Sequence, residues 1–196
     1  MKEILMLLTD QWADWEAAFV IADLNMHPDY TVKTVAADDV PKVSLGGIRA
    51  EIDCTLDSYN SYDNLAMLIV PGGLSWWDND FPEIVEFIRA VAEKQIPIAA
   101  ICGSVCFLAR HGFLNHVKHT ANALELLQDE QGYMGEKLYV ETQAVADGGF
   151  ITANESAAVE FAYEIFKVLK LGDDYEDKNK WFDYYKNGAI AGGDHE

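Results

Sequence analysis

The sequence predicts an α/β fold: a three-layer sandwich in which helices cover both faces of a mostly parallel central sheet. Short and almost continuously apolar runs occupy residues 4–8, 32–36, 67–70 and 98–101. Such runs are typical of strands that are buried on both faces of a parallel sheet. Segments with helical spacing separate the runs, and this alternation favours right-handed crossovers between parallel strands.

Two of the separating segments are expected to be helices. Residues 16–26 and 81–94 each carry apolar side chains at a spacing that gathers them on one helical face. At the start of the second segment, Asp80 precedes Pro82 and Glu83. Acidic residues and proline at these positions are typical of a capped helix start.

Two Gly-Gly pairs predict tight turns between short extended pieces. Residues 43–48 surround Gly46-Gly47, and Gly148-Gly149 repeats the pattern later in the chain. We expect both to add antiparallel strands at the edge of the sheet. Neither pair precedes the G-K-[ST] sequence of a phosphate-binding loop, so we interpret both as turns.

The chain is long enough for one domain with an appended helix. We expect an α/β domain over residues 1–171 and a C-terminal acidic, aromatic helical extension over residues 172–196. The last helix of the domain is expected to have Asn154 as its N-cap and Gly172 as its stop. The aromatic side chains of the extension would dock on the domain or on a second subunit.

Composition argues against nucleic acid and membrane partners. The formal net charge is -19 at pH 7, whereas nucleic acid and anionic membranes both demand a basic face. No apolar run approaches the roughly 20 residues that a membrane span requires. The run at residues 4–8 is too short for the core of a signal peptide. Three cysteines without a framework spacing fit a reducing compartment, so we expect a cytoplasmic protein.

Cys102 is the most informative residue, because it stands where an apolar run meets a predicted helix. A nucleophile on a sharp strand-to-helix turn needs small neighbours two places away on each side, and Ala100 and Ser104 meet that need. Gly103 would let the next amide approach closely, while the helix start would favour the thiolate. The alternative interpretation is that Cys102 is a small buried hydrophobic residue.

Other unusual residues follow the ends of other predicted strands. Glu16 comes after the first strand, Pro71-Gly72-Gly73 after the third apolar run, and Asn122 after a further strand expected at residues 117–121. In parallel α/β sheets, sites lie beyond the carboxyl ends of the strands. These segments are therefore expected to converge on Cys102 and to form a site.

These residues resemble the ThiJ/PfpI superfamily, within the class I glutamine amidotransferase-like, flavodoxin-like fold. The ordered motifs that carry the resemblance are Glu16, Pro71-Gly72-Gly73, Ala99-Ala100-Ile101-Cys102-Gly103 and His111-Gly112-Phe113-Leu114. The resemblance implies that Cys102 is the reactive nucleophile and that Glu16 hydrogen-bonds to it. It also implies an oxyanion hole formed by the amides of Gly73 and Gly103. Relatives of this fold commonly dimerise, so a homodimer is expected.

The chain departs from the family pattern at the histidine. Members with protease-type names usually carry a histidine directly after the cysteine, where this chain has Gly103. Other members place one after the next strand, where this chain has Asn122. His119 is the nearest candidate, although its position within a predicted strand can turn it away from the site. A complete Cys-His-acid triad is not visible.

Smaller signals concern the walls of the site. Trp76 and Trp77 follow Gly73 closely, so we expect Trp76, with His119 and Asn122, to line the pocket. Cys106 lies one helical turn after Cys102, where core packing is expected. Neither H-E-x-x-H nor paired C-x-x-C occurs, so neither a metal nor a cofactor is expected.

The leading functional prediction is a cysteine-dependent hydrolase of protease or amidase type that acts on a small-molecule or peptide substrate. Glu16, partly desolvated beside the sulfur, should have a raised pKa and serve as proton donor and acceptor. One alternative is a glyoxalase- or deglycase-like hydratase or lyase that acts on small reactive carbonyls. A second is a redox or stress sensor that works through oxidation of Cys102. A third is a non-catalytic interaction protein that binds through its tail.

Overall fold

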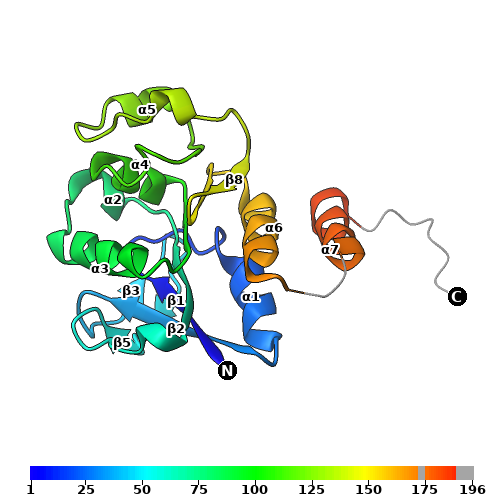
Figure 1. Ribbon diagram of the computed structural model, residues 1–196. Helices are drawn as coiled ribbons and strands as arrows, with labels where there is room; N and C mark the ends of the chain where they lie inside the picture. The colour runs from blue at the N-terminus through cyan, green and yellow to red at the C-terminus, as the bar shows by residue number, and fades with distance from the viewer. Residues whose placement is uncertain (172–174, 189–196) are drawn as a thin grey trace, which may run out of the picture.

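The computed structural model describes residues 1–171 and 175–188 of the chain (Figure 1). The strands are β1 (Lys2–Leu7), β2 (Tyr30–Ala36), β3 (Lys42–Val43), β4 (Arg49–Ala50), β5 (Cys54–Thr55), β6 (Leu65–Val70), β7 (Ile98–Ile101), β8 (Ala144–Asp147) and β9 (Phe150–Ala153). The helices are α1 (Ala18–Met26), α2 (Ser75–Asp78), α3 (Pro82–Glu93), α4 (Gly103–Arg110), α5 (Leu124–Gln128), α6 (Ala158–Leu169) and α7 (Tyr175–Asn187), with short 3-10 turns at Tyr62–Asn64 and Glu136–Leu138.

Seven strands form one sheet in the order β5-β2-β1-β6-β7-β9-β8. Every pairing in it is parallel except that of β8 with β9, which is antiparallel. The four apolar runs are β1, β2, β6 and β7, so the predicted α/β sandwich with a mostly parallel sheet is confirmed. The hairpin β3-β4 forms a separate two-stranded sheet, so only the second Gly-Gly turn adds to the edge of the main sheet.

The core divides into two clusters, one on each face of the sheet. Successive side chains of β1 alternate between them: Leu5 packs toward α3 and α4, whereas Ile4 packs toward α1 and α6. Figure 1 shows the two helical layers on opposite sides of the sheet. Burial on both faces explains why β6, β7 and the buried part of β1 are continuously apolar.

Two predicted element boundaries are wrong. Residues 117–121 form no strand, and His119 makes only an isolated bridge with Tyr139. Helix α6 begins at Ala158, because the Asn154 side chain accepts hydrogen bonds from Ser156 in a turn that precedes the helix.

At its other end, α6 stops where Lys170 adopts a left-handed conformation with φ of 56°. The Leu171 N–H bonds back to the Phe166 carbonyl, which closes the last turn. Gly172, the predicted stop, lies outside the described residues.

Helix α7 is the described part of the predicted extension, and it packs on α1 and α6 (Figure 1). The Trp181 ring lies edge-on to Phe166 with centroids 4.9 Å apart, and its Nε1 donates to the Asp23 carboxylate. Residues 172–174 and 189–196 of the predicted extension lie outside the described residues. Within the described ranges, no helix is both long and apolar enough to cross a bilayer.

Candidate active site

Cys102 forms a sharp turn between the end of β7 and the start of α4. Its φ of 61° and ψ of -127° lie in a strained region for a residue with a side chain. Two contacts hold the turn: the Cys102 N–H donates to the Ala153 carbonyl at 3.0 Å, and the Ser104 Oγ accepts from the Ile101 N–H at 3.0 Å. The small residue predicted at position 104 therefore also supplies a hydrogen bond that stabilises the elbow.

Glu16 lies in the loop between β1 and α1, and only 1% of its surface is exposed. Its Oε2 accepts a hydrogen bond of 2.6 Å from the Gly72 N–H. Its Oε1 is buried and has no hydrogen-bond partner among the described residues. The carboxyl group nevertheless interacts with the Cys102 side chain. The predicted cysteine–acid pair is thus brought together by loops that follow different strands.

The turn after β6 consists of Gly72 and Gly73 because the neighbouring groups leave no space for a side chain. A Cβ on Gly72 would lie 2.6 Å from the Glu16 Oε2 and 2.8 Å from the Cys102 Cβ. A Cβ on Gly73, whose φ is 148°, would lie 2.4 Å from the Gln11 carbonyl oxygen. Side chains at these positions would therefore displace the groups of the site.

Two backbone amides at the site are free to bind an anion. The Gly73 and Gly103 N–H groups donate to no carbonyl in the described part of the chain, and Gly103 opens α4. The Gly103 N–H faces the Cys102 sulfur, where it favours the thiolate. Such amides at a helix start are suited to an oxygen that gains negative charge.

Asn122 contacts Cys102 directly. Its Nδ2 lies 3.4 Å from the Cys102 Sγ and 3.1 Å from the Glu155 Oε2. Its Oδ1 accepts from the Glu155 N–H at 2.8 Å, so both ends of the amide are held. Sequence reasoning missed Glu155, although an acidic residue that closely follows β9 is the same signal that pointed to Glu16.

His119 and Trp76, both predicted to line the pocket, are instead held in the protein interior. The His119 ring contacts the Val117 carbonyl at 2.8 Å through Nδ1 and the Tyr133 hydroxyl at 2.7 Å through Nε2. The Trp76 indole donates to the Pro71 carbonyl and packs against a core phenylalanine. Without a regular strand there, period-2 alternation could not predict where His119 points.

Burial, neighbouring charges and hydrogen bonds control the protonation of the pair. Burial raises the pKa of Glu16 to about 7, although the Gly72 N–H and Cys102 oppose this. Burial and the Glu16 charge raise the pKa of Cys102 to about 12, despite Asn122 and the Gly103 N–H. The sequence-based expectation of a raised Glu16 pKa agrees with this geometry. The expected thiolate is opposed by desolvation and by the carboxylate, which raise the pKa of Cys102 more than the amides of the turn lower it.

A cavity of about 370 Å³ opens over Cys102 and Glu16. Its wall residues are Trp15, Leu45, Leu74, Trp77, Asn122 and Glu155, with Gly73 at its floor. Trp77 rather than Trp76 is therefore the tryptophan of the pair that reaches the site. Among the described residues, no group of three or more His, Cys, Asp and Glu side chains could hold a metal ion.

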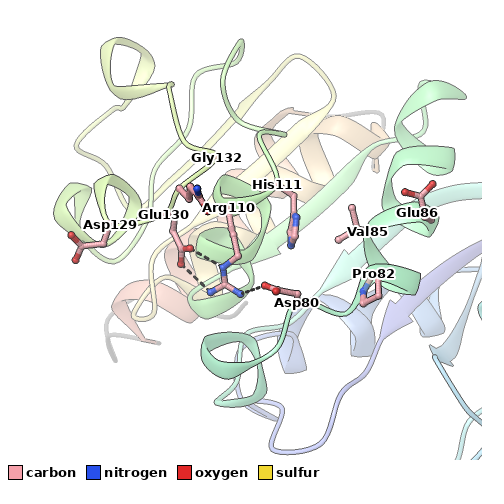
Figure 2. Close-up of a pocket in the computed structure, with 10 residues that line it drawn as sticks. Asp80, Pro82, Val85, Glu86, Arg110, His111, Asp129, Glu130 and Gly132 are labelled. Carbon is pink, nitrogen blue, oxygen red and sulfur yellow. Dashed lines mark hydrogen bonds and ion pairs between the residues drawn. The ribbon is translucent and has the colours of Figure 1, made fainter.

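A second cavity, of about 660 Å³, lies beside the far end of α4 and contains neither Cys102 nor Glu16 (Figure 2). Arg110 crosses it, bonding Glu130 at 2.7 and 3.1 Å and pairing with Asp80 at 3.6 Å. The same guanidinium donates to the backbone carbonyls of Asn79 at 3.0 Å and Trp77 at 3.5 Å. Arg110 thus ties the end of α2, which carries Trp77, to α4, the helix that follows Cys102.

The Glu16→Gln variant is expected to be more stable than the wild type at pH 8 but not at pH 4.5. Folding raises the pKa of Glu16 from 4.5 to about 7, so its stabilising contribution is present below pH 4.5 and is lost as the pH rises through 7. Ionisation of this buried group costs about 3 kcal/mol by pH 8. Urea unfolding of both proteins at both pH values measures the difference. Glu93→Gln, an exposed position on α3, is the control, and an identical Glu16→Gln effect at both pH values would contradict the prediction.

Comparison with known proteins identifies clear relatives. The sequence profile of the DJ-1/PfpI family matches residues 2–168. The protein named "Uncharacterized protease YdeA" of Bacillus subtilis (strain 168) is 39% identical over 169 residues, which cover 86% of this chain and 84% of that protein. "Uncharacterized protease YoaZ" of the same strain is 32% identical over 178 residues, covering 86% of this chain and 83% of that protein.

Solved structures agree with these matches. The DJ-1 superfamily protein Atu0886 from Agrobacterium tumefaciens superposes with a TM-score of 0.87 at 31% identity, covering 95% of this chain and 99% of that chain. The thiJ/pfpI family protein from Bacillus anthracis has a TM-score of 0.86 at 32% identity, covering 94% of this chain and 90% of that chain.

Proposed function

The chain belongs to the DJ-1/PfpI family, and on that premise we propose that it is a cysteine-dependent hydrolase of activated acyl compounds. Cys102 is the nucleophile, Glu16 is the proton acceptor and donor, and the Gly73 and Gly103 amides bind the oxyanion. Two relatives named as proteases support a hydrolytic reaction. The observation that carries the proposal is a buried Glu16 with one unpartnered oxygen, beside a cysteine on a strained elbow.

The proposed reaction starts from a thiol and a carboxylate. The Cys102 sulfur bonds to the carbonyl carbon as its proton passes to Glu16, and the carbonyl oxygen takes up the negative charge. The two glycine amides stabilise that oxyanion. The oxyanion then collapses, the leaving group takes the proton from Glu16, and a thioester remains. Water attacks the thioester, losing its proton to Glu16, and the acid and the thiol are released.

No histidine of the described residues lines the cavity, and this supports a restricted substrate range. His119 is bonded to Val117 and Tyr133, so it is not available to Cys102, and Glu16 is the carboxyl group that interacts directly with the Cys102 side chain. A single carboxyl group with a pKa of about 7 protonates good leaving groups more readily than the amine of a stable peptide. Esters, thioesters and activated amides are therefore the proposed substrates.

A second candidate is hydration or rearrangement of small reactive carbonyl compounds. It uses the same attack by Cys102, after which Glu16 moves a proton on the adduct instead of on a leaving group. The pKa of about 7 for Glu16 favours this candidate, because the group can both accept and return a proton near neutral pH. A sensor role is less favoured, since a thiol whose pKa is raised to about 12 reacts slowly with peroxide.

We extend the proposal to assembly and organisation. Members of the family are commonly homodimers and generally intracellular, and we propose both properties for this chain. Residues 1–171 form the proposed catalytic domain, onto which α7 packs as an extension.

An assay against p-nitrophenyl acetate, an unactivated peptide and methylglyoxal tests the proposal. We expect rapid hydrolysis of the ester, one acetyl group on Cys102 in the intact-mass spectrum during turnover, and a much slower reaction with the peptide. Turnover of methylglyoxal without acylation by the ester would replace the leading proposal with the second. If no compound reacts faster with the wild type than with Cys102→Ala, both enzymatic proposals are rejected.

A further inference from the structure

The mouth of the catalytic cavity is apolar. Four side chains from separate segments form its rim, namely Trp15, Leu45, Leu74 and Trp77. Each of them is between 38% and 51% exposed, so they present large apolar surface to whatever enters. Grouped exposure of this kind at a concave site indicates a binding surface rather than isolated surface residues.

Hydrogen bonds hold one wall of this rim in place. Leu45 lies in the turn of the β3-β4 hairpin, and its N–H donates to the Trp12 carbonyl at 2.9 Å. Asp14 accepts from the Gly46 N–H at 2.9 Å and from the Ser44 hydroxyl. The hairpin is thereby fastened to the loop that carries Trp15 and Glu16.

The opposite wall is held as firmly. The Leu74 N–H donates to the Gln11 carbonyl at 3.1 Å, and Arg110 binds the backbone carbonyls of Trp77 and Asn79. Arg110 is itself fixed by two bonds to Glu130. An apolar group that enters the cavity therefore meets preorganised walls, which lowers the entropic cost of binding.

The charged side chains that line the cavity are acidic. Glu16 and Glu155 both line the cavity, and within the described part of the chain no lysine, arginine or histidine does. Glu155 is held beside Cys102 through Asn122. A carboxylate on the substrate would therefore meet like charge without a cation to bind it.

We propose that this site acts on uncharged acyl compounds that carry an aromatic or branched apolar group. Trp15 and Trp77 hold that group, and Glu155 excludes substrates with a carboxylate near the reacting carbonyl. The inference rests on the function proposed above and adds the substrate class. Trp15, Trp77 and Glu155 are specificity-determining residues in this account.

The test uses three p-nitrophenyl esters, the acetate, the phenylacetate and the hemisuccinate, and measures the second-order rate of Cys102 acylation. For the wild type we expect the phenylacetyl ester to react at least about 10-fold faster than the acetyl ester, a typical worth of a well-placed apolar group. The succinyl ester, whose acyl group carries a carboxylate, should react about 10-fold more slowly than the acetyl ester.

Single-residue variants test which side chain causes the preference for the phenylacetyl ester and which causes the discrimination against the succinyl ester. Trp15→Ala and Trp77→Ala should each lower the ratio of the phenylacetyl rate to the acetyl rate from about 10 to about two or less. Glu155→Gln keeps an acceptor for Asn122 and should raise the succinyl rate about five-fold or more relative to acetyl. Tyr184→Ala on α7 and Glu93→Gln on α3, both at exposed positions, are matched controls that should change no ratio.

The experiment distinguishes failure of the proposed hydrolase function from failure of the proposed substrate class. If none of the esters acylates Cys102, the proposed hydrolase is wrong. Equal rates for the three esters, or wild-type rate ratios in the Trp15, Trp77 and Glu155 variants, would overturn the substrate class alone.

Discussion

Replacing Cys102 with serine is expected to lower kcat/KM for a p-nitrophenyl ester on the order of 10⁴-fold or more, because in the proposed reaction this side chain forms the bond to substrate. An alcohol is far less acidic than a thiol, so the Glu16 carboxylate, with a pKa of about 7, cannot remove its proton effectively. Serine fits the space of cysteine, and the elbow contacts through Ser104 and the Cys102 N–H remain. Initial-rate kinetics with matched unfolding curves measure the loss.

Cys54→Ser is the matched control. The Cys54 thiol lies on β5, where it contacts the Thr34 carbonyl at 3.8 Å, a bond that a hydroxyl can also make. This variant should keep the wild-type rate. A Cys102→Ser protein that retains more than about a tenth of the activity while Cys54→Ser loses it would reject the assigned nucleophile.

Glu16→Gln is expected to lower kcat by roughly 10²- to 10⁴-fold, the usual contribution of a positioned general base. Wild-type activity should rise with pH through about 7 as Glu16 ionises. The activity of the variant should show no such rise. The variant should also react faster with iodoacetamide at pH 8. Removing the Glu16 charge takes away one cause of the raised pKa of Cys102 and so increases the thiolate fraction.

Glu16→Gln is expected to lower the rate of turnover but to raise the rate of alkylation by iodoacetamide. This difference in direction distinguishes a general base from a residue with a structural role. A purely structural role for Glu16 would lower both rates together, because the elbow itself would be disturbed. Glu93→Gln provides the comparison for loss of a carboxylate at an exposed position away from the site. Loss of turnover with an unchanged pH profile would show that Glu16 does not transfer the proton.

The residues of the site that could be predicted are those with a local signature. Cys102 lies between small residues at a strand-to-helix junction, and Glu16 and Gly73 follow strands whose carboxyl ends must meet at one edge of the sheet. Asn122 was expected there by motif alignment, and its amide lies 3.4 Å from the sulfur. Residues 117–121 form no strand, and hydrogen bonds with Glu155 hold the Asn122 amide at the site.

Predictions that depended on side-chain direction were wrong where the backbone is irregular. Trp76 and Trp77 are adjacent, yet Trp76 is buried and Trp77 lines the cavity, because the short helix α2 turns them to different sides. His119 lies in a segment without regular pairing, so no periodicity determines its direction.

The protonation state of Cys102 depends on tertiary structure as well. A helix start favours thiolate in any sequence, but the depth of burial and the nearby Glu16 raise the pKa of Cys102 to about 12.

The sequence by itself determined the sheet, the order of its segments and the elbow, because apolar runs, helical spacing and small residues act through local geometry and burial. Only the tertiary structure decided which side chains surround the sulfur. Trp15, Leu45 and Glu155 reach the cavity from three segments distant in sequence, and their meeting depends on how loops pack rather than on any local pattern. Desolvation and like charge also depend on these distances, so the pKa values of Glu16 and Cys102 were likewise set by packing.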